Sequence, residues 1–344
     1  MNNKKVVVCL IFLIGFILAA CKNVNKVAID ELDKDDIAQE EIIEKEEKVD
    51  STLTNISEAS NQEAVVFYAG GDFIKSVFAV GGDMLFIYGI NPNGKKFLGY
   101  MNKEENVFQE ISVDYPENMR AFNMTVDDDN QCHILWMSTE KVTLDGQTLD
   151  LITYEESYIT IVNARDGINA EIDVSHIFNK ERKRPYCFIT DRDGNYYFEN
   201  GEEIVKVSPK GILVMEIICP GWVEGIGMGK SGTVYCTYEN ENGDKMLGKI
   251  VNEKFVSCEL DLPDSDAIYG NISAGTDTEV LMYNKDGGVY IYDDVKNVIE
   301  PRIASNDLPI QGEEVVGYGF LGDGRLCLLT QKEETIFYYV PAGK

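Results

Sequence analysis

Six segments of this chain repeat one pattern, and the repetition constrains the fold more than any other feature. Each segment has a short apolar run, a tight turn rich in Gly, Asn or Asp, and a second run of β-branched and aromatic residues. Such segments are typical of β-hairpins. They are residues 78–89, 124–137, 187–200, 225–238, 272–284 and 317–330, with Gly82, Asn130, Gly194, Gly232, Thr278 and Gly324 marking the turns. Self-similarity of this kind predicts a repeat protein.

A third strand-like run follows each hairpin, and a fourth closes most of the repeats. In the third repeat these runs are IVKVS at 204–208 and ILVMEII at 212–218. Four antiparallel strands per repeat, six times over, predict an all-β fold, a six-bladed β-propeller of four-stranded antiparallel blades over residues 64–344. A β-sandwich, two smaller β domains and a seven-bladed ring remain open alternatives.

The last repeat has three strand-like runs, whereas the run AVVFYA at 64–69 stands alone before the first repeat. We predict that residues 64–69 pair with residues 335–340 and complete the last blade. Strands from both ends of the domain would then close the ring, which leaves no open sheet edge at the junction.

The N-terminus has the features of a bacterial secretory signal. Two lysines lie within residues 1–5, and an apolar run covers residues 6–18. This run is shorter than the roughly 20 residues of a membrane-spanning helix. LAAC at 18–21 resembles the lipobox of bacterial lipoproteins, in which the cysteine is lipidated. The sequence therefore predicts a signal peptide at residues 1–20 and lipidation of Cys21, and an ordinary signal peptide with a chance cysteine is the alternative.

Residues 21–63 differ in composition from the rest of the chain. They are rich in Asp and Glu and contain no aromatic residue. A segment of this kind cannot bury enough apolar surface to offset the entropy lost on ordering. We predict a lipid-anchored, acidic, disordered linker that holds the domain of residues 64–344 at the outer, extracellular face of the cell membrane.

The chain carries a formal net charge of −28. Binding to nucleic acid depends on cationic side chains, so a nucleic-acid partner is excluded. The same charge opposes flat docking on anionic lipid. The lipid anchor at Cys21 is therefore the expected contact with the membrane.

Two segments carry a family resemblance. GNYYFENGEEIVKVSPKG at 194–211 resembles the NHL-type repeat of six-bladed propellers, and DGGVYIYDD at 286–294 is similar to blades of bacterial sensory propellers. Together with the lipobox and the acidic linker, they resemble propeller lipoproteins of Gram-positive anaerobes, some of which continue into a solute-binding domain. The resemblance implies a propeller fold and, as a function, an accessory or sensor lipoprotein of a solute transporter.

The connections between repeats are longer and more aromatic than the turns within them. In propellers such connections commonly surround the ligand-binding funnel, where aromatic rings suit stacking on a sugar or a peptide. Packing between blades is the alternative for each ring. The candidate ligand-binding aromatic residues are Trp222, Tyr115, Tyr186 and Tyr269.

One of these connections contains the dense basic run KERKR at 180–184. Arg182 and Arg184 are candidates for holding a carboxylate or a phosphate, because the guanidinium group offers paired donors. A solvated loop that makes surface ion pairs is the alternative.

Motifs for metal, nucleophilic or nucleotide chemistry are absent or incomplete. His133 and His176 are the only histidines, no C-x-x-C occurs, and disulfide pairing is left open. Asp191 and Asp193 begin a calcium-like pattern that ordinary turn chemistry explains. Gly227-x-Gly229-x-x-Gly232 fits a phosphate-binding fingerprint, but the strand-like TVYCTY follows it instead of a helix. We therefore expect no nucleotide at Gly227–Gly232, no metal, no cofactor and no identifiable catalytic residue.

These features favour a binding or scaffold lipoprotein over an enzyme. The leading hypothesis is a membrane-anchored extracellular module that recognises a polymer, a peptide or a protein through its loop face. An extracellular carbohydrate-active hydrolase or lyase and an accessory lipoprotein of a transporter are the alternatives.

Overall fold

The computed structural model divides the chain into two units, residues 1–57 and 58–344. The described residues all belong to the second unit: 67–68, 75–90, 95–104, 108–115, 118–144, 147–178, 185, 187–262, 272–274, 278–284, 288–308, 314–331 and 335–340. Residues 1–63, with the predicted signal peptide, Cys21 and the predicted acidic linker, lie outside them. Among the described residues, no helix has the length and apolar character needed to cross a membrane.

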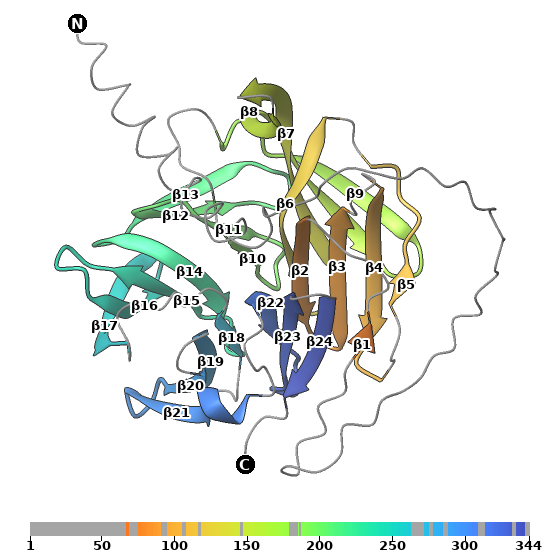
Figure 1. Ribbon diagram of the computed structural model, residues 1–344. Coiled ribbons are helices and arrows are strands. Elements are labelled where there is room, and N and C mark those ends of the chain that lie inside the picture. The colour runs from red at the N-terminus through yellow and green to blue at the C-terminus, as the bar shows by residue number, and fades with distance from the viewer. Residues whose placement is uncertain are drawn as a thin grey trace, which may run out of the picture. The chain divides into compact units, whose positions relative to one another are not determined.

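The described residues are almost entirely β-strands, which form antiparallel groups of four that we call meanders 1 to 6 (Figure 1). Meander 1 contains β2 (Lys75–Gly81), β3 (Met84–Ile90), β4 (Lys96–Asn102) and β5 (Gln109–Glu110); meander 2 contains β6 (Met119–Val126), β7 (Cys132–Leu144), β8 (Gln147–Asn163) and β9 (Gly167–Asp173). Meander 3 contains β10 (Phe188–Thr190), β11 (Tyr196–Glu199), β12 (Glu203–Val207) and β13 (Leu213–Ile218); meander 4 contains β14 (Trp222–Met228), β15 (Val234–Glu239), β16 (Lys245–Val251) and β17 (Lys254–Asp261). Meander 5 contains β18 (Ile272–Ala274), β19 (Glu279–Asn284), β20 (Gly288–Asp293) and β21 (Val298–Ala304), followed by the short 3₁₀ helix η1 (Ser305–Asp307).

Meander 6 joins the two ends of the domain. It contains β22 (Glu314–Phe320), β23 (Leu326–Gln331), β24 (Thr335–Val340) and, as its fourth strand, β1 (Phe67–Tyr68). Phe67 pairs with Phe337 and Tyr68 with Ile336 in antiparallel register. The predicted pairing of residues 64–69 with 335–340 is confirmed at Phe67 and Tyr68, and residues 64–66 and 69 lie outside the described residues.

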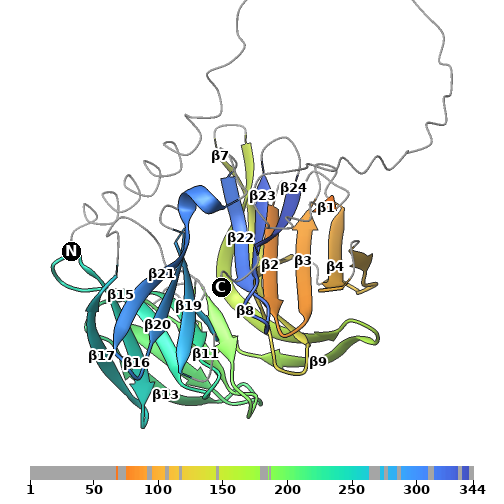
Figure 2. The same cartoon turned by 90° about the horizontal axis from the view of Figure 1, so that it is seen from below.

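The first strands of successive meanders are neighbours. β2 contacts β6, β6 contacts β10, β10 contacts β14, β14 contacts β18, β18 contacts β22, and β22 contacts β2. Figure 2 shows β22 and β2 side by side although they lie at opposite ends of the domain sequence. In meanders 4 and 5 the contact is a parallel pair between Gly227 and Ile272, which joins the two into one eight-stranded sheet.

Short turns at one end of the meanders are also linked to each other. Asp83 donates its N–H to Asn130 Oδ1 at 2.9 Å, and Gly322 donates to the carbonyl of Gly82 at 2.7 Å. Arg192 bridges its neighbours on both sides, through Asp128 at 2.9 Å and the carbonyl of Lys230 at 3.0 Å. These links connect meander 6 to meander 1, 1 to 2, 2 to 3 and 3 to 4.

Turn chemistry accounts for the calcium-like pattern in the third repeat. Asp191 Oδ1 accepts the N–H groups of Asp193 at 3.0 Å and Asn195 at 2.8 Å, and Gly194 has φ of 77°. An Asp side chain commonly stabilises a turn in this way, and glycine tolerates the positive φ. The Asp191 carboxylate is therefore engaged by the turn itself.

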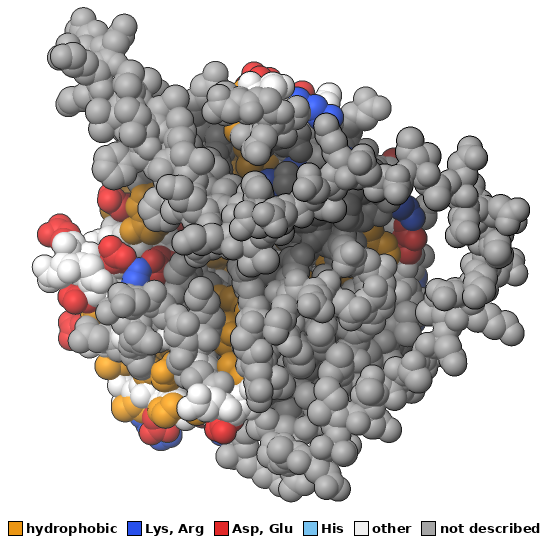
Figure 3. All heavy atoms as spheres, in the orientation of Figure 1, with side chains coloured by type: hydrophobic (Ala, Val, Ile, Leu, Met, Phe, Trp, Pro, Cys, Tyr) orange, Lys and Arg blue, Asp and Glu red, His pale blue; other side chains and the backbone are white. Residues whose placement is uncertain are grey.

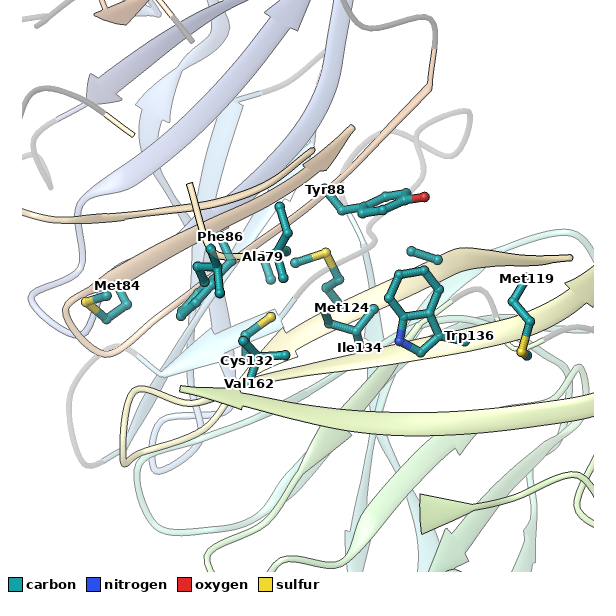
Figure 4. Packing of buried hydrophobic residues seen from close by; sticks show 13 residues of the cluster. Ala79, Met84, Phe86, Tyr88, Met119, Met124, Cys132, Ile134, Trp136 and Val162 are labelled. Atoms are coloured by element: carbon teal, nitrogen blue, oxygen red, sulfur yellow. The ribbon is translucent and has the colours of Figure 1, made fainter. Parts of the chain in front are cut away.

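The hydrophobic core consists of six clusters, each between two consecutive meanders. The cluster between meanders 1 and 2 contains Phe86, Tyr88, Ile134 and Trp136 (Figure 4). The cluster between meanders 6 and 1 brings Leu329 against Ile87. Second strands are consequently buried on both faces, as the burial of all four residues of β11 illustrates.

The six cysteines of the described residues are buried and unpaired: Cys132, Cys187, Cys219, Cys236, Cys258 and Cys327. Burial raises the pKa of the Cys132 thiol well above the ordinary value. The pKa of the Cys236 thiol is also raised well above it, first by a hydrogen bond with Cys219 and then by burial. They act as small apolar side chains of the core.

Candidate functional site

The inner strand of meander 4 presents Trp222 at the end where the strand begins. Trp222 is the first residue of β14 and pairs directly with Glu239, which pairs in turn with Lys245. Directly opposed residues in neighbouring strands place their side chains on the same face of a sheet. Trp222, Glu239 and Lys245 therefore form a row across three strands, with the indole half-buried.

A β-bulge brings a fourth side chain to this row. The pairing of β14 with β15 shifts between Val223 and Gly225, so Glu224 is the extra residue. Bulges redirect a side chain and are common beside functional sites. The Nζ of Lys245 contacts Oε1 of Glu224 and lies 2.6 Å from Oε2 of Glu239. We call Glu224, Glu239 and Lys245 the Lys245 cluster.

The Lys245 cluster holds its lysine in the charged form. The side chain of Lys245 is 9% exposed and that of Glu224 is 15% exposed. Burial lowers the pKa of Lys245, but the hydrogen bonds and charges of Glu224 and Glu239 outweigh it, so the pKa is raised. A lysine nucleophile or base needs a lowered pKa. This lysine is therefore an electrostatic anchor.

Glu224 also offers an unused acceptor. Its Oε2 atom is buried and, in the described part of the chain, accepts no hydrogen bond. Leaving a buried acceptor unsatisfied costs about 1–3 kcal/mol, and more for a charged group. A ligand with an N–H or O–H donor beside Trp222 would remove this cost.

Meander 3 holds the start of β14, where Trp222 lies. Val223 donates its N–H to the carbonyl of Gly201 at 2.7 Å, which ties the start of β14 to the β11–β12 turn. Glu199, just before that turn, is fully buried and accepts the N–H groups of Cys187 at 3.3 Å and Gly201 at 3.5 Å. Trp222 thus projects from a strand that two meanders hold in place.

Tyr115 lies in a different place, between meanders 1 and 2. Its ring centroid is 6.0 Å from that of Tyr88 and 6.5 Å from that of Trp136, and the Nζ of Lys96 lies 5.7 Å from it. Burial raises the pKa of Tyr115 to about 12. Its ring packs between meanders, so the structure does not bring it together with Trp222. The sequence did not indicate Tyr88 and Trp136 as its partners.

The remaining candidates lie outside the described residues and stay predictions. They are Arg182, Arg184, Tyr186, Tyr269 and Cys21. Within the part of the chain that is described, no group of three or more His, Cys, Asp or Glu side chains could hold a metal ion. Figure 3 shows acidic side chains along the edge of the face that it draws.

A second polar cluster joins meanders 4 and 5, and the sequence did not suggest it. Asp294 accepts the hydroxyl groups of Tyr292 at 2.9 Å and Tyr235 at 3.1 Å and forms an ion pair with Lys249. Burial raises the pKa of Asp294, but these partners more than offset it and the pKa is lowered. The cluster is a structural link between the two meanders.

This link makes stability depend on acid pH. Because the folded-state pKa of Asp294 is below the ordinary 3.8, its contribution is present above pH 3.8 and is lost as the pH falls through the folded value. We expect Asp294→Asn to lower the free energy of unfolding by about 1–3 kcal/mol at pH 7. The difference from the wild type should therefore be smaller at pH 3 than at pH 7. Urea unfolding at both pH values measures it, and a difference that is equal at both would contradict the assignment.

Comparisons with known proteins give the fold type. No family model matches this sequence, and no curated protein matches it either. A structure of YCF48 bound to D1 peptide is 11% identical, with 83% of this chain and 96% of that chain covered and a TM-score of 0.50. A glucose dehydrogenase is 11% identical, with 81% and 99% covered and a TM-score of 0.50. A protein of unknown function from Bacteroides caccae is 10% identical, with 69% and 80% covered and a TM-score of 0.43.

At such low identity the likeness concerns the fold alone. YCF48 and glucose dehydrogenase are β-propeller-type proteins. The all-β architecture of four-stranded antiparallel meanders agrees with that type. The chain therefore has a fold similar to the β-propeller.

Proposed function

We propose that this protein is a lipid-anchored binding module, a closed six-bladed β-propeller that recognises a basic peptide segment of an extracellular partner. The cyclic order of contacts among β2, β6, β10, β14, β18 and β22 supports the closed ring. The placement of one core cluster between each consecutive pair of meanders supports it as well. Cys21 carries the anchor, and the acidic linker spans the distance to the propeller.

The Lys245 cluster beside Trp222 is the observation that carries the binding function. Glu224 offers a buried acceptor, Glu239 adds a second negative charge that is 45% exposed, and the half-buried Trp222 belongs to the same row. A lysine or arginine side chain satisfies all three, since its N–H groups reach a carboxylate while its cation stacks on the ring. The net charge of −28 attracts such a segment from a distance.

The fold type is compatible with peptide recognition. YCF48, which has a similar fold, has been solved with a bound peptide. This precedent concerns that protein and supports only the suitability of the architecture. The raised pKa of Lys245 favours binding over covalent catalysis at this place.

Carbohydrate chemistry is the second candidate. Trp222 also suits stacking on a sugar ring, and a glucose dehydrogenase shares the fold type. A hydrolase or lyase would need an acid–base pair near the indole, and the carboxylates there are paired with Lys245. A transporter accessory lipoprotein is a third use of the same module, with the solute or its carrier as the ligand.

Tryptophan fluorescence tests the proposal, because the chain has two tryptophans. Trp136 is buried and donates Nε1–H to Thr160 at 2.8 Å, so Trp136→Phe leaves Trp222 as the only reporter. We expect capped tetra-lysine or tetra-arginine to change the emission of this variant in the full chain held in detergent. Capped tetra-glutamate is the control and should have no effect.

One further variant, a change of ionic strength and a neutral ligand decide between the candidates. Glu224→Gln should weaken the response to tetra-lysine by about tenfold, since a charge-assisted hydrogen bond is lost. Raising the ionic strength to about 1 M should weaken it as well. A response to neutral oligosaccharides, with release of smaller products and none to the basic peptides, would replace the proposal with the carbohydrate enzyme.

A further inference from the structure

The fourth strands of the meanders form the outer edges of the sheets, and most of them carry protection against pairing with another chain. Short length, charges, proline and irregular backbone all serve this purpose. Among the described outer strands, β5 is two residues long. β17 has Glu259 with φ of 55°, and β21 contains the exposed Pro301 and Arg302.

β13 differs from these strands. It lies at the end of the order β10-β11-β12-β13, so its outer edge pairs with no strand among the described residues (Figure 1). Its sequence contains no proline and one charged residue, Glu216. Ile218 is 67% exposed, Val214 is 48% exposed, and Ile212 just before the strand is 61% exposed. An apolar outer strand of this kind is a template for an added strand.

The backbone of β13 is oriented for that purpose. Cys219 donates its N–H to the carbonyl of Glu202 beside β12 at 2.8 Å. Backbone groups of successive residues in a strand point to opposite sides. The N–H and C=O of Ile218 therefore point away from β12, toward the outer edge.

A groove of about 480 Å³ adjoins the same strand. One wall is formed by residues 216–220, which include Ile217, Ile218 and Pro220, and the other by residues 253–255 at the β16–β17 turn. Phe255 contributes an apolar surface, whereas Glu216, Glu253 and Lys254 add two negative charges and one positive charge. The groove can accept side chains of a strand that lies along β13.

We propose that β13 binds an extended segment of a partner protein by β-strand addition, with apolar side chains alternating with basic ones. Main-chain hydrogen bonds to the outer edge give affinity, and alternate apolar side chains enter the groove. The two acids and one base of the groove favour a basic segment. A second copy of this chain is a poorer occupant because each copy carries a charge of −28. Trp222 and the Lys245 cluster do not line this groove, so the proposal goes beyond the proposed function.

The test uses the full chain in detergent and a fluorescein-labelled capped heptapeptide of alternating lysine and valine. We expect saturable binding by fluorescence anisotropy, together with slower hydrogen exchange of the amides in residues 213–218. A peptide of the same composition with its lysines in one block measures charge attraction alone and should bind at least about tenfold more weakly. A fully N-methylated peptide cannot donate main-chain hydrogen bonds and should not slow the exchange of these amides.

Matched variants locate the site. Ile218→Lys places a charge on the strand and should weaken binding by about tenfold or more, whereas Ile168→Lys on β9, where the side chain is 44% exposed, should leave it unchanged. Glu224→Gln should leave the slower exchange of residues 213–218 unchanged, which separates this site from the one at Trp222. Equal binding of the alternating and block peptides would overturn the proposal. So would a dimer of the wild type that Ile218→Lys abolishes, since a second copy would then occupy the edge.

Discussion

Replacing Gly227 by alanine should lower the free energy of unfolding by about 3 kcal/mol or more. An added Cβ atom would lie 1.9 Å from the carbonyl oxygen of Ile272 and 2.4 Å from its carbonyl carbon. Because these are backbone atoms of the neighbouring strand, the contact is relieved only if β14 and β18 separate. The expected result is a large loss of stability, measured by urea unfolding of the full chain.

Gly243→Ala is the control for this substitution. Gly243 lies in the β15–β16 turn with φ of 85°, and nothing lies within 4 Å of its added Cβ. We expect a loss of about 1 kcal/mol from the unfavourable backbone conformation alone. If both variants lose the same small amount, the close approach of β14 to β18 is wrong. Gly227 is the first glycine of the fingerprint-like pattern Gly227-x-Gly229-x-x-Gly232. Its role is structural, because it allows β14 and β18 to lie close together.

Replacing Lys245 by methionine should lower the free energy of unfolding by about 3 kcal/mol at pH 7. The substitution keeps the length of the side chain but leaves Glu224, which is 15% exposed, and Glu239 without their cation. Water screens Glu239, which is 45% exposed, so most of the loss comes from Glu224. Urea unfolding of the variant and of the wild type at pH 7 measures the difference.

Lys296→Met is the matched control for Lys245→Met. Lys296 forms an ion pair with Asp293, but its side chain is 71% exposed, so its removal should change stability little. Adding Glu224→Gln to Lys245→Met should restore part of the lost stability, since the uncompensated charge is removed. Equal effects of the two lysine substitutions would show that the Lys245 cluster is not a buried electrostatic anchor.

Local patterns predicted the strands well because each strand and turn depends on its own residues. Gly194, Gly232 and Gly324 have positive φ and lie in turns that the hairpin patterns predicted. The pairing of the first strand with the last was predictable because a four-stranded repeat lacked one strand. Residues 138–144 and 147–157 prolong the hairpin of β7 and β8.

The polar sites depended on distant residues and were not predictable in the same way. Glu224 reaches Lys245 only because of a bulge, which no local pattern marks. Asp294 meets Tyr235 and Lys249 across two meanders, so its role follows from packing between them. The sequence indicated Trp222 as a candidate by itself. Its neighbours Glu239 and Lys245 were identified only from the pairing of β14, β15 and β16. The exposed apolar edge of β13 likewise required knowledge of which strand lies outermost.

Closure of the ring is the central claim, and a cross-link between β1 and β24 tests it most directly. Phe67 and Phe337 are paired across antiparallel strands, in which opposed Cα atoms lie about 4.5–5.5 Å apart, within the range of a disulfide. The double variant Phe67→Cys/Phe337→Cys should form this disulfide on oxidation and unfold at a higher temperature than its reduced form, because the cross-link restricts the unfolded chain. The native thiols of the described residues are buried and should not interfere, and Phe67→Cys with Ile168→Cys on β9 should not cross-link. Mass spectrometry of the folded, oxidised protein gives the answer: a disulfide between residues 67 and 337 is the predicted result, and two free thiols at these positions in a protein that remains folded would contradict the closed ring.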